Sequence, residues 1–150
     1  MHIQEQMPPQ TVQYCRDEKL IGLVTALINA AFEVYDTVVV IVTQKHRKDL
    51  YKTLTIEMLA NEKLMLLDAA DLLSQFMVED WPNEPRFMET METILRPGCI
   101  IGRVRVINEL AGILCAEGKA GAAIRVEELW KTLVTRQRCS AVGISAVCIV

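Results

Sequence analysis

A short run of basic residues stands where the sequence could bind an anion. Thr43 to Lys48 (TQKHRK) follows an apolar β-branched run and begins a predicted helix. Backbone dipoles make the first turn of a helix positive, so acids are preferred there and cations reduce stability. The placement fits a site for a carboxylate or phosphate-bearing ligand, with His46 and Arg47 as donors and Thr43 at the strand end. A solvated basic helix end is the competing interpretation.

Acidic residues follow two other predicted strands. Asp68 and Asp71 come at the end of a strand over 63–68, and Glu109 follows a strand over 103–107 that contains Arg105. Ligands bind beyond the carboxyl ends of parallel strands, so these acids are candidates for ligand or metal contact. The spacing of Asp68 and Asp71 favours helix capping instead. Glu109 is favoured in the first turn of a helix whether or not it has a function.

Several enzyme signatures are absent from the sequence. It contains no G-x-x-x-x-G-K-[ST] phosphate loop, no G-x-G-x-x-G and no G-x-S-x-G. His46 is the one histidine in the region expected to fold, which excludes a histidine-rich metal centre. We therefore expect a non-enzymatic protein with no catalytic residue, no metal and no cofactor.

The hydrophobic pattern predicts alternating strands and helices. The uninterrupted β-branched run at 37–43 is typical of a parallel strand covered on both faces. Glu127 and Lys131 are expected as an i,i+4 pair on the exposed side of a late helix. Pro97 and Gly98 should end an earlier helix at Arg96. Further strands are expected at 11–15, 63–68, 103–107 and 141–150, and helices at 17–36, 44–60, 69–79, 83–96, 108–117 and 122–133.

Strands separated by helices imply βαβ units with right-handed crossovers. We predict an α/β fold of three layers, in which a mostly parallel central sheet of about five strands is flanked by helices. Residues 1–10, with two adjacent prolines, are expected to be a flexible lead-in, and residues 11–150 a single domain.

Composition and net charge exclude several further classes of protein. With 51% hydrophobic and 23% charged residues, the chain is able to bury a core. A net charge of −3 disfavours direct binding to nucleic acid. Five cysteines without a C-x-x-C pair indicate free thiols in a reducing cytosol. No signal peptide and no run of roughly 20 apolar residues is present, so we expect a cytoplasmic protein without membrane contact.

Three segments stand in a recognisable order and spacing. They are 66–77 (LLDAADLLSQFM) with Pro82 and 85–87 (PRF) after it, 104–110 (VRVINEL), and 114–119 (LCAEGK) continuing into 122–130 (AAIRVEELW). From about Tyr14 to Leu133 the chain thereby resembles the MEDS family, the methanogen/methylotroph sensory domain of regulators of dichloromethane metabolism.

The resemblance implies a RecA/KaiC-like domain that has lost its phosphate loop and senses small molecules. It also implies a DNA-binding or kinase module as output, which would lie on another chain. The matching positions that could contact a ligand are Tyr14, Thr43, His46, Arg47, Asp68, Arg105 and Glu109.

Three functional hypotheses follow. The first is a sensory domain in transcriptional or two-component-type signalling that binds a small organic or anionic ligand at the carboxyl edge of the sheet, and it is compatible with a homodimer. The alternative is a degenerate nucleotide-binding protein or an enzyme that uses Asp68 and Glu109. The third is a protein-interaction module in which the C-terminal strand, 141–150, pairs with a partner's edge strand.

Overall fold

The central sheet of the protein has five parallel strands. The computed structural model describes residues 10–35 and 37–146. The strands lie in the order β1-β7-β6-β2-β3, and each neighbouring pair is parallel. They are β1 (Gln10–Cys15), β2 (Thr37–Val42), β3 (Leu64–Asp68), β6 (Val104–Asn108) and β7 (Cys139–Ala146).

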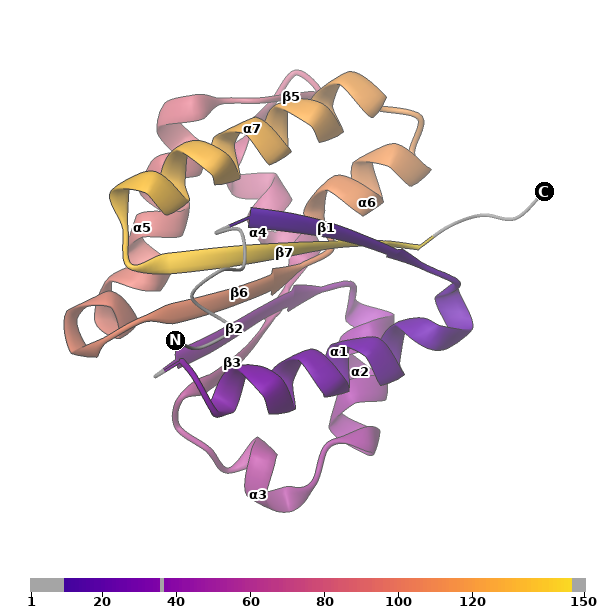
Figure 1. The fold of residues 1–150 in the computed structure, drawn as a ribbon. Helices are drawn as coiled ribbons and strands as arrows, with labels where there is room; N and C mark the ends of the chain where they lie inside the picture. Colours follow the sequence, from indigo (N-terminus) through magenta and orange to yellow (C-terminus); the bar gives the residue numbers. More distant parts are fainter. Residues whose placement is uncertain (1–9, 36, 147–150) are drawn as a thin grey trace.

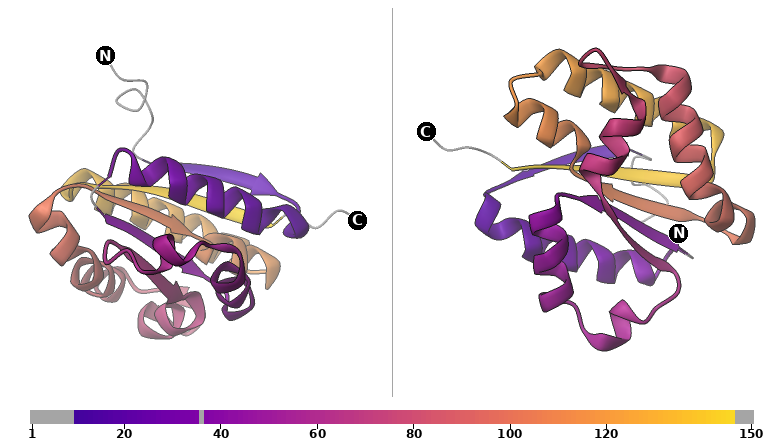
Figure 2. Two further views of the ribbon diagram at one scale, coloured as in Figure 1. Left: turned by 90° about the horizontal axis from the view of Figure 1, so that it is seen from below. Right: turned by 180° about the vertical axis from the view of Figure 1, so that it is seen from behind.

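Helices cover both faces of this sheet (Figure 1). One face carries α1 (Asp17–Phe32), α2 (Gln44–Thr53) and α3 (Ile56–Leu59). The other carries α4 (Ala69–Phe76), α5 (Glu84–Ile101), α6 (Leu110–Ala116) and α7 (Ala120–Arg136). The turned views of Figure 2 show the same three layers. The predicted three-layer α/β fold is therefore confirmed, in a RecA-like arrangement.

The buried residues divide into two cores, one on each side of the sheet. Successive side chains of a strand point to opposite faces. Val38, Val40 and Val42 accordingly pack with α1 and α2, while Val39 and Ile41 pack with the helices of the opposite face. Because β2 is buried on both faces, its side chains are all apolar apart from Thr37, as the sequence predicted.

The strand order determines which strands of the sheet have both neighbours within the protein. β7 lies between β1 and β6. It pairs with β1 over 141–146 and with β6 over 139–143, so it is an inner strand of the sheet. Residues 147–150 of the predicted strand lie outside the described part. Among the described strands, β1 and β3 are the outer ones, and β3 is half-buried rather than fully buried. The expected lead-in, through residue 9, also lies outside the described residues.

The prediction of a single helix over 44–60 is wrong, because the structure divides this segment into α2 and α3. Leu54 is extended, and Thr55 begins α3 by accepting a 3.2 Å hydrogen bond on Oγ1 from the Met58 N–H. A threonine at this position satisfies a helix N–H and makes a new start favourable.

The predicted helix over 69–79 ends at Phe76. A short hairpin follows, formed by β4 (Met77–Val78) and β5 (Trp81–Pro82). Its turn holds Glu79 at φ 51° and Asp80 at φ 63°, both in the left-handed region. The chain therefore reverses within two residues, of which aspartate adopts this conformation more readily than glutamate.

The predicted helix end at Arg96 is also wrong, because α5 continues through Pro97 and Gly98 to Ile101. A Cβ at Gly98 would lie 2.7 Å from Val104 Cγ2. The glycine therefore allows the last turns of α5 to pack closely on β6. Pro97 is on the exposed side of the helix, where water can bind the carbonyl group that loses its partner.

Among the helices of the described residues, none has the length and apolar character that crossing a membrane requires.

Candidate functional site

His46 lies between two acidic side chains at the carboxyl edge of the sheet. Glu109 follows β6, and its Oε1 and Oε2 atoms lie 2.9 and 2.8 Å from His46 Nδ1. Asp17, the first residue of α1, places Oδ1 3.0 Å from His46 Nε2. His46 and Glu109 are only 6% and 4% exposed, whereas Asp17 is exposed. We call these three residues the His46 cluster.

Thr43 joins the cluster to the start of α2. Its Oγ1 accepts a 3.1 Å hydrogen bond from the His46 N–H, and its own N–H donates 2.9 Å to Glu109 Oε2. The Glu109 carboxylate therefore lies at the positive end of α2, where an anion is favoured. The basic run at 43–48 predicted a bound anion at this helix start, and the Glu109 carboxylate of the protein itself lies there.

The cluster favours the charged form of His46. Both ring nitrogens face carboxylates, and only an imidazolium donates from both. The hydrogen bond to Glu109 raises the pKa of His46, more than burial lowers it. The hydrogen bond from His46 in turn lowers the pKa of Asp17. Both ring nitrogens are hydrogen-bonded to carboxylates, and the cluster thereby joins α1, α2 and the end of β6.

Cys15 is the nucleophilic side chain nearest in sequence to this cluster. Burial raises the pKa of its thiol, and the charges of Glu109 and Asp17 raise it further. The thiolate is the reactive form of cysteine. The surroundings of Cys15 therefore favour an unreactive thiol.

Arg47 and Arg105 stack on tyrosines instead of joining the cluster. The guanidinium carbon of Arg47 lies 5.8 Å from the centre of the Tyr51 ring. That of Arg105, which is buried, lies 5.6 Å from the centre of the Tyr35 ring. Arg105 stands four residues before Glu109, roughly 13 Å along an extended strand. It is therefore near the amino edge of the sheet, away from the His46 cluster.

Asp68 caps α4, which confirms the capping interpretation. Its Oδ1 accepts a 2.9 Å hydrogen bond from the Ala70 N–H. Asp68 and Asp71 also line a hollow of about 620 Å³ beside α5, with Arg86 and Glu89. No hydrogen bond or ion pair in the described part of the chain joins Asp68 to Glu109, whose oxygens bind His46 and Thr43. The structure thus brings Thr43, His46 and Glu109 together and leaves Asp68 apart.

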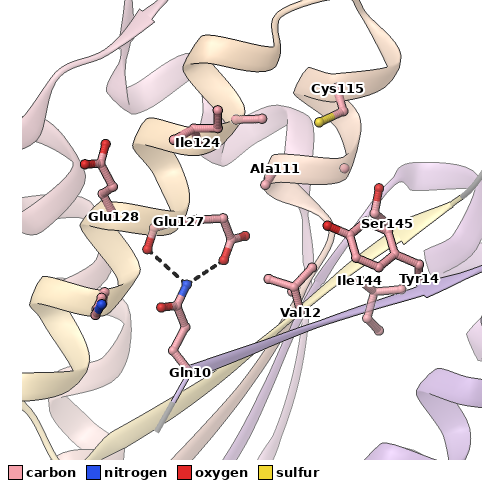
Figure 3. Close-up of a pocket in the computed structure, with 14 residues that line it drawn as sticks. Gln10, Val12, Tyr14, Ala111, Cys115, Ile124, Glu127, Glu128, Ile144 and Ser145 are labelled. Atoms are coloured by element: carbon pink, nitrogen blue, oxygen red, sulfur yellow. Dashed lines mark hydrogen bonds between the residues drawn. The ribbon is translucent and has the colours of Figure 1, made fainter. Parts of the chain in front are cut away.

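Tyr14 lines a separate cavity, which we call the edge pocket. It has a volume of about 300 Å³ and lies between β1, β7, α6 and α7 (Figure 3). Its middle is apolar, while Gln10 and Glu127 lie on one side and Tyr14 and Ser145 on the other. The lining residues are Gln10, Val12, Tyr14, Ala111, Gly112, Cys115, Ala123, Ile124, Glu127, Glu128, Lys131, Gly143, Ile144 and Ser145.

Glu127 faces this pocket, so the predicted exposed pairing with Lys131 is wrong. The Gln10 amide donates to the Glu127 backbone carbonyl at 3.0 Å and to Oε2. Oε1 is buried and has no hydrogen-bond partner among the described residues. Burial raises the pKa of Glu127. Gln10 and Glu127 are 117 residues apart, so no local pattern in the sequence could have joined them.

In the described ranges, no group of three or more histidine, cysteine or acidic side chains is arranged to hold a metal ion. Comparison of the chain with protein-family models, curated protein sequences and solved structures found no match. The MEDS resemblance therefore stays a prediction that depends on the three sequence segments.

Proposed function

We propose that this protein is a non-enzymatic sensory domain that binds a small organic molecule in the edge pocket. The observation that carries the proposal is an apolar, solvent-open pocket of about 300 Å³ with a few polar groups around it. Ligand sites commonly have this character, with volumes from about 300 Å³ upward. Tyr14 and Ser145 stand near the carboxyl ends of β1 and β7, the edge at which the sequence predicted a ligand.

The His46 cluster is placed to transmit ligand binding from the edge pocket to α2. Tyr14 of the pocket stands three residues before Asp17, and Ala111 of the pocket stands two residues after Glu109. Both acids that hold His46 are therefore attached to walls of the pocket. A ligand that favours one spacing of β1 and α6 would also favour one arrangement of the cluster and of α2, by population shift.

Unfolding measurements with added molecules test the proposal. The probes are octylamine, octanol and octanoate, each used below the concentration at which it forms micelles. A molecule that binds only the folded protein raises its free energy of unfolding by about 2.7 kcal/mol at about one hundred times its dissociation constant. We expect at least one probe to raise the unfolding midpoint in a saturable manner.

Two variants locate the binding. Ile124 lines the pocket and is 63% exposed, so Ile124→Trp should fill the opening without disturbing the core and should abolish the ligand effect. Ile100 on α5 is 75% exposed and does not line the pocket, so Ile100→Trp should retain it. The proposal fails if no probe stabilises the protein, or if Ile124→Trp binds as well as Ile100→Trp.

Shifts in the His46 ring signals test the transmission. In a nuclear magnetic resonance titration, a bound probe should move the signals of His46 in parallel with those of the pocket residues. Unchanged His46 signals at saturation would contradict the coupling, while leaving binding in the pocket supported.

A further inference from the structure

We propose that the edge pocket selects a hydrophobic molecule that carries a positively charged amine at one end, with Glu127 as the group that recognises the amine. This inference rests on the proposed function, since it names the ligand class of the same pocket.

The first support is an unsatisfied oxygen. The Gln10 amide donates to Oε2 of Glu127, whereas Oε1 has no partner among the described residues. A buried acceptor without a hydrogen bond is costly, and a charged one more so. Burial raises the pKa of Glu127, which is the sign of a carboxylate that lacks compensation. An ammonium group would supply both the missing donor and the missing charge.

The second support is the position of the Glu127 carboxylate at the wall of the pocket. Both Glu127 and Gly143 line the pocket, and a Cβ at Gly143 would lie only 2.9 Å from Glu127 Oε1. The absence of a side chain at Gly143 therefore lets the carboxylate lie over β7. Any larger residue at this position would occupy the space that the carboxylate now uses.

The third support is the charge and polarity of the lining. Glu127 and Glu128 are acidic and Lys131 is the one basic side chain, so the lining side chains sum to −1 when all are ionised. This net charge favours a cationic head group over an anionic one beside Glu127 and Glu128. Val12, Ile124 and others make the middle apolar, as Figure 3 shows, so the body of the ligand should be hydrophobic.

The matched octyl series tests the ligand class, because its members share one chain and differ in the head group. By calorimetry at about pH 7, we expect octylamine to bind at least roughly tenfold more tightly than octanol, and octanoate most weakly. Glu127→Gln keeps the shape of the side chain but removes the charge. It should abolish the preference for octylamine and leave the affinity for octanol unchanged, whereas Glu128→Gln should keep most of the preference.

A pH series on the unaltered protein gives the same information without a variant that could fail to fold. Octylamine affinity should fall as the pH drops and Glu127 becomes neutral, while octanol affinity should stay constant. The inference is overturned if octanoate binds as tightly as octylamine, or if Glu127→Gln keeps the amine preference. In both of those results binding persists, so the proposed function stands. If none of the three probes binds, the proposed function fails too.

Discussion

Replacement of Glu109 by glutamine should destabilise the protein by about 3–5 kcal/mol, the usual loss when one partner of a buried ion pair is removed. The carboxylate accepts from His46 Nδ1 and from the Thr43 N–H, and Glu109 is only 4% exposed. Water therefore cannot replace it. Glutamine retains one acceptor oxygen, which can serve His46 or Thr43, so the loss should fall toward the lower end of this range.

Urea unfolding at about pH 6 measures this loss, since His46 is charged there. The matched control is Glu128→Gln, an exposed acid on α7 that should change stability by about 0.5 kcal/mol or less. A double-mutant cycle with His46→Gln isolates the interaction between the two side chains. A loss below about 1 kcal/mol for Glu109→Gln, or a coupling energy near zero, would refute the view that the cluster is a strong buried ion pair.

The pH dependence of stability follows from the same cluster. The folded protein raises the pKa of His46 above its unfolded value of about 6.5. The contribution of His46 is therefore fully present below that value and is lost as the pH rises through the raised pKa. Stability of the unaltered protein should fall over this interval, and that of Glu109→Gln should fall less. Equal pH profiles for the two proteins would contradict the assignment.

Two backbone predictions can be checked by the same urea measurements. Gly112→Ala should cost about 1–3 kcal/mol, because a Cβ there would lie 2.8 Å from the Ile144 carbonyl oxygen. Gly22 lies on the exposed face of α1 and a Cβ there would meet nothing within 4 Å, so Gly22→Ala should instead stabilise the protein. Equal effects of the two substitutions would contradict the close packing of α6 on β7. Glu79→Asn should stabilise by about 0.5 kcal/mol, since asparagine accepts the left-handed turn more readily than glutamate while Asp80 keeps its 3.1 Å hydrogen bond from Lys119 Nζ; a loss of stability would contradict the left-handed conformation at this position.

The sequence by itself determined the features that depend on neighbouring residues. The β-branched run of β2 predicted a strand buried on both faces, and Asp68 predicted the start of α4 by capping. The hairpin after α4 was missed, because its turn holds Glu79 and Asp80 in place of the usual asparagine and glycine. Local patterns are visible in a sequence only when the residues are typical of the structure they form.

Tertiary structure alone decided which of the candidate residues meet. His46 and Glu109 are 63 residues apart, and Gln10 and Glu127 are 117 apart. Their contacts depend on the strand order, which places β6 beside β2 and β1 beside β7. The sequence showed that the start of α2 favours an anion, but not that Glu109 supplies it. The sequence gives the chemical type of each side chain. The distances between side chains that are remote in sequence depend on the order of the strands and the packing of the helices.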